Sequence, residues 1–272
     1  MKIILIMFAI PAVLLPAACV VYIFYQAMPA LNLSLIFGSD ISVAGVNSIG
    51  QSILPQITGS LLMMGLACFI ALPIALSIAL FHAFWATHNQ RKLLMAVLQM
   101  LQGIPPIVYG LCGLIVLVHI LQWGISLAAG SVILAIIILP LLSNSLIHAF
   151  ARIPCEQTDA ALSLGLSKLS VIVRIWLPAS WSNILTGLLL SMARALSETA
   201  PILFTATVFS GITWPDSIFS PVTSLQTHIF YLAQEGSNIQ AIHTAWASAA
   251  SLLLLVLCFS LAAWYLRRYD TT

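Results

Sequence analysis

Six apolar runs separated by short polar connections set the pattern of this chain. They cover approximately residues 3–25, 57–85, 93–120, 127–150, 183–209 and 242–266. A hydrocarbon core about 30 Å thick takes about 20 helical residues to cross, and every run reaches that length. The pattern predicts an all-α polytopic membrane protein with six transmembrane helices.

Basic residues lie in the connections on one side of this pattern only. The segments 26–56, 121–126 and 210–241 contain no Lys or Arg, and they hold Asp40, Asp216 and Glu235. Because basic connections stay in the cytoplasm, the N- and C-termini are predicted to be cytoplasmic. The basic residues that define this side are Lys2, Arg91, Lys92, Arg152, Lys168, Arg174, Arg267 and Arg268.

Composition agrees with this class and excludes others. Hydrophobic residues make up 61% of the chain, charged residues 6%, and the mean hydropathy is +1.10. A soluble domain carries about a quarter charged residues. The net charge of +2 gives no support for nucleic-acid binding. The first run continues past Cys19 to Tyr25, which favours an uncleaved span over a signal peptide.

The predicted organisation has two parts. Residues 1–56 form the first transmembrane helix and an outer loop, and residues 57–272 form a core transmembrane domain. Within the core, the cytoplasmic loop at about 152–180 is a polar, charged island, and Thr223–Gln234 is predicted to be a short amphipathic helix at the outer surface.

The polar island has the signals of a short helix. Pro154 suits a first helical position, Glu156 and Asp159 place negative charge near the helix start, and Gly165 suits a left-handed exit. The apolar residues Ala160, Ala161, Leu162 and Leu164 cover more than one stripe. The helix is either an interfacial helix between two spans or one that inserts into a partner protein.

The fifth run contains a charged pair at a depth where charge is costly. Arg194 and Glu198 are four residues apart and so share a helix face. A charge at the bilayer centre costs about 2.5 to 3.5 kcal/mol on insertion scales, so such residues face protein or water. Two interpretations remain open, a structural ion pair and an anion pathway in which Glu198 limits how tightly Arg194 holds the ion.

Two apolar runs carry helix-breaking residues. Pro201 deprives the Ser197 carbonyl of its helical partner, and Ser197 and Thr199 offer polar lining beside it. In the third run, Pro105 and Pro106 follow Gly103. Non-helical backbone at this depth is tolerated where it is buried in protein or lines a cavity, so each break is either a packing kink or part of a pathway.

The sequence offers little for catalysis. It contains no phosphate-binding loop of the Gly-x-x-x-x-Gly-Lys-Ser/Thr type, no His-Glu-x-x-His and no Gly-x-Ser-x-Gly. We expect no metal site and no cofactor bound by this chain. The histidines are scattered at His82, His88, His119, His148, His228 and His243.

Three segments carry a resemblance to a known family. The spacing from Asp159-Ala160-Ala161 through Gly165 to Ile175 and Leu177-Pro178 resembles the EAA loop of ABC importer permeases, with Asp159 in place of the usual Glu. The segments GIPPIVYGL and MARALSETAPILFTA resemble GVPSIVYGL and ARALGETAPLLFTA of PstA-type phosphate permeases. Pro106 replaces a usual Ser, and Ser197 replaces a usual Gly.

The resemblance implies a type I ABC importer permease in a bacterial inner membrane. Its partners would be a PstC-type permease, two PstB-type ATPase subunits that bind ATP and Mg, and a periplasmic PstS-type phosphate-binding protein. It implies alternating access, with Arg194, Glu198, Ser197 and Thr199 on the pathway, and it places ATPase coupling in the helix from Glu156 to Gly165. The alternatives are a permease for molybdate or sulfate and, less favoured, an intramembrane enzyme.

Overall fold

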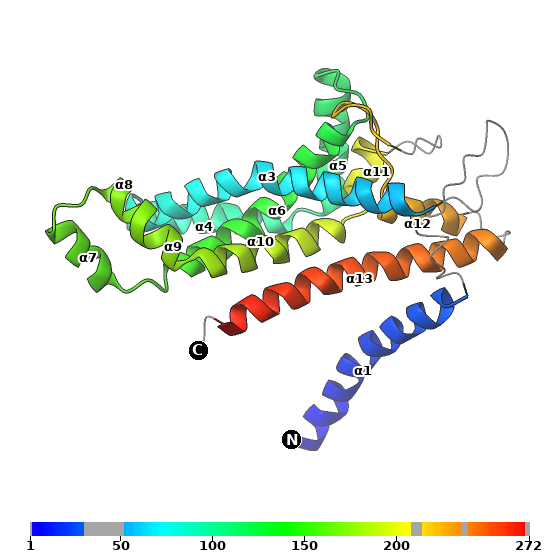
Figure 1. Ribbon diagram of the computed structural model, residues 1–272, viewed down its shortest axis with the longest axis horizontal. Coiled ribbons are helices and arrows are strands. Elements are labelled where there is room, and N and C mark those ends of the chain that lie inside the picture. Colours follow the sequence, from blue (N-terminus) through cyan, green and yellow to red (C-terminus); the bar gives the residue numbers. More distant parts are fainter. Residues whose placement is uncertain (1, 30–51, 208–213, 235–238, 270–272) are drawn as a thin grey trace.

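The computed structural model describes residues 2–29, 52–207, 214–234 and 239–269, and every regular element within those ranges is a helix. Figure 1 shows an elongated bundle in which α3, α6, α10 and α13 run roughly along the long axis. The helices are α1 (Lys2–Ala27), α3 (Leu54–Phe84), α4 (His88–Gly103), α5 (Pro106–Gly113), the π-helix η1 (Leu114–Ile120), α6 (Leu127–Phe150), α7 (Cys155–Ser163), α8 (Lys168–Val171), the π-helix η2 (Ile172–Trp176), α9 (Leu177–Ala179), α10 (Trp181–Leu196), α11 (Ala200–Thr205), α12 (Leu225–Gln234) and α13 (Ile239–Tyr269).

Four of the six predicted spans are single long apolar helices. They are α1, α3, α6 and α13, and each contains an apolar stretch of 18 residues or more. The predicted all-α polytopic fold is therefore confirmed over the described residues. The predicted outer loop lies largely at residues 30–51, outside the described residues.

The predicted third span, 93–120, is not one straight helix. α4 and the segment Pro106–Ile120 meet at 87°, so this run is a bent pair. The bend follows from the two prolines, because Pro105 cannot donate to the carbonyl of Leu101. The Tyr109 hydroxyl donates to that carbonyl instead, at 2.8 Å, and so satisfies the group that the break leaves open.

The predicted fifth span, 183–209, is also interrupted. α10 has 16 residues and α11 has 6, and the chain leaves the helix at Ser197–Thr199 between them. Neither piece reaches the roughly 20 residues that a straight crossing requires. The run predicted at 183–209 therefore consists of two helices, and they are separated beside Pro201, where a break was predicted.

The core is built on a stripe of small residues along α3. Ala67, Ala71, Ala75 and Ala79 recur every fourth residue and are fully buried. They share one buried cluster with large residues of α6, among them Ile138 and Leu142. Small side chains let two membrane helices approach closely, so that dispersion contacts can hold them where lipid offers no hydrophobic drive.

α12 lies against the ends of α3 and α10 and confirms the short helix predicted at 223–234. Its Gln226 amide donates to the Leu196 carbonyl at the end of α10, at 2.7 Å, and accepts from the Ser60 hydroxyl at 3.1 Å. Gln226, Leu196 and Ser60 are all buried. The hydrogen bond from Gln226 satisfies the Leu196 carbonyl, which lies beside the break after α10. The helix caps the bundle on the side opposite α7 (Figure 1).

The directions of the helices agree with the charge pattern. In Figure 1, α13 runs from the α12 end of the bundle toward the end that carries α7, and α1 runs the opposite way beside it. The last turn of α13 thus lies toward the α7 end of the bundle. That this end faces the cytoplasm remains a prediction from the distribution of Lys and Arg.

Candidate functional site

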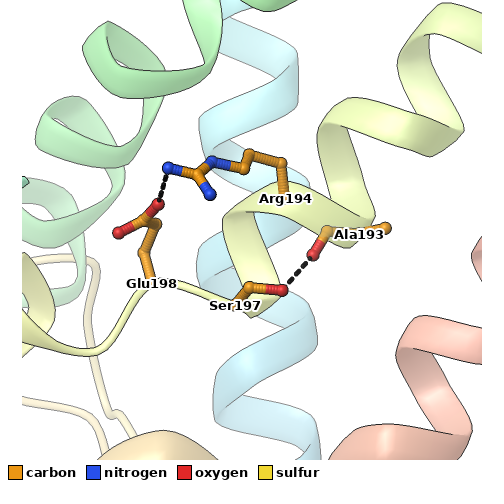
Figure 2. Close-up of polar contacts among 4 residues, drawn as sticks. All are labelled: Ala193, Arg194, Ser197 and Glu198. Atoms are coloured by element: carbon orange, nitrogen blue, oxygen red, sulfur yellow. Dashed lines mark hydrogen bonds and ion pairs between the residues drawn. The ribbon is translucent and has the colours of Figure 1, made fainter. Parts of the chain in front are cut away.

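Arg194 and Glu198 form an ion pair at the point where α10 ends. One guanidinium nitrogen, Nη2, lies 2.6 Å from Glu198 Oε1 (Figure 2). The Arg194 side chain is 51% exposed in this chain, whereas the Glu198 side chain is only 8% exposed. Glu198 is therefore held inside the fold, and Arg194 offers its remaining N–H groups outward.

Those outward groups border a cavity of about 260 Å³. It is lined by Arg194 of α10, by Gln102, Ile104, Pro106 and Tyr109 at the α4–α5 break, and by Leu101, Ile137 and Leu141. The volume is far above the roughly 10–15 Å³ that one water needs. Arg194 is the single charged residue in this lining, so the cavity presents positive charge.

The two helix breaks are packed against each other. A Cβ atom added to Gly110 of α5 would lie 2.7 Å from Cα of Pro201 in α11, and one added to Gly113 would lie 2.6 Å from Ile133 Cγ1 of α6. Only glycine allows the backbones to approach this closely. Two segments that are about 90 residues apart in sequence are thus assembled into one site.

We predict that Gly110→Ala destabilises the protein through this contact. The added methyl would overlap the Pro201 backbone, and overpacking of this kind costs about 1 to 3 kcal/mol. The matched control is Gly103→Ala, because nothing lies within 4 Å of a Cβ at that position. Thermal unfolding of both variants in detergent checks this, and equal midpoints would contradict it.

The polar residues predicted beside the break have differing roles. The Ser197 hydroxyl donates to the Ala193 carbonyl at 2.9 Å, one turn back in α10 (Figure 2), and the Thr205 hydroxyl donates to the Pro201 carbonyl at 2.8 Å. Ser197 therefore secures the helix end, although its residue is exposed. Thr199 is half-buried at the start of α11.

The second group of predicted site residues forms α7, at the end of the bundle away from α12. Pro154 stands one residue before the helix, Glu156 lies in its first turn, and Asp159 follows. Gly165 has φ of +82°, so the predicted left-handed exit is present. Glu156, Asp159 and Ala160 are exposed.

Ala161 departs from the expectation that the whole apolar set of α7 is available to a partner. It is 5% exposed within the chain itself. Leu162 and Leu164 are 38% and 84% exposed. The surface that a partner could cover therefore consists of Ala160, Leu162 and Leu164, and Ala161 faces the loop's own interior.

Trp176 fastens the loop to the membrane helices. Its indole N–H donates to the Thr158 hydroxyl of α7 at 3.0 Å. Its ring centroid lies 4.3 Å from that of Phe84 at the end of α3 and 5.5 Å from that of Phe150 at the end of α6. One side chain thus contacts α7 and the ends of two long helices.

Sequence reasoning did not single out Tyr109, Trp176 or Gln226. Tyr109 carries a usable signal, since it stands four residues after Pro105 and can supply the hydrogen bond that the proline cannot. Trp176 and Gln226 act across 18 and 30 residues of sequence, and no local pattern points to their partners.

None of the six histidines lines the Arg194 cavity. His228 contacts the Ser248 hydroxyl at 3.1 Å, which joins α12 to α13. Burial lowers the pKa of His228 to about 4, so the side chain is neutral near pH 7 and serves packing.

The fold and site define a class: a polytopic helical subunit whose broken helices border a charged cavity, with a loop helix exposed at one end. The chain resembles a subunit of the MetNI methionine ABC transporter in an inward-facing form, with a TM-score of 0.63 and 15% identity over 81% of this chain and 96% of that one. This likeness establishes the type I ABC importer permease fold.

Residues 71–269 match the family "Binding-protein-dependent transport system inner membrane component", and the chain belongs to that family. Among curated relatives, the probable ABC transporter permease protein YqgI of Bacillus subtilis is 26% identical over 90% of this chain and 86% of its own. The phosphate transport system permease protein PstA of Xylella fastidiosa is 31% identical over 75% and 71%. The chain is an integral membrane permease component and not an enzyme.

Proposed function

We propose that this chain is the PstA-type permease subunit of an ATP-driven phosphate importer in a bacterial inner membrane. It forms half of the translocation pathway. The other half is a PstC-type permease, and a PstS-type protein delivers phosphate. Two PstB-type ATPase subunits bind ATP and Mg, and this chain binds neither.

The observation that carries the proposal is the half-exposed Arg194 bordering a cavity between two helix breaks. Guanidinium groups hold phosphate through paired, charge-assisted hydrogen bonds. Glu198 occupies one edge of the guanidinium and offsets part of its charge. An anion therefore meets an attractive site that is not strong enough to retain it, which conduction requires.

Coupling is assigned to α7 and Trp176. The exposed face of α7 fits a groove on an ATPase, and Trp176 passes any displacement of α7 to the ends of α3 and α6. When the ATPase dimer closes, the bundle changes the side to which the Arg194 cavity opens. The Pst-type segments and the phosphate-named relative favour phosphate over other oxyanions.

The test is uptake of radiolabelled phosphate by the assembled complex in proteoliposomes. ATP is supplied on the side of the membrane that carries the ATPase subunits. We expect uptake that needs the binding protein and is competed by unlabelled phosphate but not by equal concentrations of sulfate or molybdate. Equal competition by sulfate or molybdate would assign the permease to another oxyanion.

A further inference from the structure

A second cavity, of about 540 Å³, is lined by residues of α6 and α10, as the Arg194 cavity is, but it lies nearer to α7. Its lining is mostly polar and basic, and no acidic residue belongs to it. The residues that line it are Ser145, His148, Ala149, Ala151, Arg152, Asn183, Thr186, Leu190 and Arg267.

The two cavities follow one face of each helix. On α10, residues 183, 186 and 190 line the second cavity and Arg194 borders the first, at spacings of three and four residues. On α6, Ile137 and Leu141 line the first cavity, and Ser145 and His148 continue the same face into the second. Such spacings place side chains in one row along a helix. Asn183 and Arg194 are eleven residues apart on α10, or about 16 Å along its axis, and Leu190 at the near edge of the second cavity is four residues from Arg194.

The basic groups come from three separate parts of the chain. Arg152 follows α6, and its Nη1 donates to Asn183 Oδ1 of α10 at 3.3 Å, so its guanidinium is directed across the cavity. Arg267 comes from the last turn of α13. His148, Arg152 and Arg267 are exposed in this chain. Basic side chains from three parts of the chain therefore border one cavity, whereas a run of consecutive basic residues would point in several directions.

The charge balance distinguishes this cavity from the one beside α7. There, Arg91 and Lys168 line a space of about 470 Å³ together with the carboxylate of Asp159. In the second cavity, two guanidinium groups, an imidazole and the polar groups of Ser145, Asn183 and Thr186 border the space without a carboxylate. Planar guanidinium groups with several neutral donors match the tetrahedrally arranged oxygens of a phosphate group.

We propose that this cavity is a phosphate-group binding site formed by Arg152, Arg267, His148 and Asn183. Its occupant is either inorganic phosphate leaving the Arg194 cavity or the phosphodiester headgroup of an anionic lipid at the predicted cytoplasmic surface. Basic pockets between helices on this side of a membrane are suited to such headgroups. The inorganic-phosphate occupant rests on the proposed transport function, whereas the headgroup occupant does not.

The experiment compares charge variants in the assembled complex. Arg152→Gln with Arg267→Gln removes both guanidinium groups, and Arg152→Lys with Arg267→Lys keeps the charges. Arg268→Gln is the matched control, because Arg268 lies over the Trp264 ring, 5.6 Å from its centroid, and does not line the cavity. Each is reconstituted in phosphatidylcholine alone and in phosphatidylcholine with phosphatidylglycerol.

We expect the double glutamine variant to take up phosphate about tenfold more slowly than the Arg268→Gln control, and the double lysine variant to lie between them. A loss in both lipids identifies free phosphate as the occupant, and a loss confined to vesicles with phosphatidylglycerol identifies the headgroup. Rates equal to the control in both lipids would overturn the proposal.

A binding measurement keeps the inference separate from the proposed function. Native mass spectrometry counts phosphatidylglycerol and inorganic phosphate retained by the wild-type and double glutamine complexes. Retention of either by the wild type, and its loss in the variant, supports the site even if the complex transports no phosphate. Equal retention in both complexes is incompatible with it.

Discussion

Replacing Arg194 by alanine is expected to lower ATP-driven phosphate uptake by about 100-fold or more, because two or more charge-assisted hydrogen bonds of about 1.5 to 3 kcal/mol each are lost from the pathway. Arg194 supplies the charge that borders the cavity between the helix breaks. Initial rates of labelled phosphate uptake in proteoliposomes measure the effect. Arg194→Lys keeps the charge but loses the planar fork, and an intermediate rate is expected for it.

The control for this prediction addresses the partner charge. Arg194→Ala leaves Glu198, whose side chain is 8% exposed, without its counter-ion, and that could impair folding. The double variant Arg194→Ala, Glu198→Ala removes both charges and is expected to assemble normally while still failing to transport. Wild-type uptake by the double variant would limit the pair to a structural role.

Leu164→Asp is expected to release the ATPase subunits from the complex. Leu164 is 84% exposed on the α7 loop, and its burial against a partner is worth about 1.5 to 3 kcal/mol. The aspartate would add the cost of placing a charge in that contact, so the affinity should fall by about 100-fold. Co-purification of tagged permease with the ATPase measures it.

Ser163→Asp is the matched control, since it adds the same charge to the last position of α7 at an exposed residue that is already polar. Gly165 provides a second comparison. Gly165→Asn tolerates the left-handed backbone that Gly165→Val does not, and a Cβ there meets no atom within 4 Å. If Leu164→Asp and Ser163→Asp retain equal amounts of ATPase, α7 does not dock through this residue.

Most of the fold could be predicted from apolar length and from Lys and Arg placement. Both signals depend on the membrane as solvent and not on contacts between distant residues. Gly165 could be predicted in the same way, because a left-handed exit is a local property. Arg194 and Glu198 were identifiable because a charge is conspicuous in an apolar run.

The third and fifth runs show the limit of that reasoning. Pro105, Pro106 and Pro201 indicated that both runs would break, but neither hydropathy nor proline specifies an angle, so the sequence could not give the 87° bend after Gly103. The approach of Gly110 to Pro201 depends on how two distant segments pack. The burial of Ala161 is decided by the loop's own tertiary fold, which the apolar pattern of α7 does not show.

Ser180 joins α9 to α10 without interrupting the hydrogen-bond ladder: its N–H donates to the Trp176 carbonyl at 3.0 Å, and its carbonyl accepts from Ile184 at 2.8 Å. Backbone hydrogen bonds therefore connect Trp176 to α10, the helix that carries Arg194 and ends at Leu196. With 16 residues, α10 is about 24 Å long, so a tilt of about 10° at Trp176 would swing its far end through an arc of about 4 Å. Under the proposed function, a small displacement of α7 by the ATPase would therefore produce a larger displacement at Arg194.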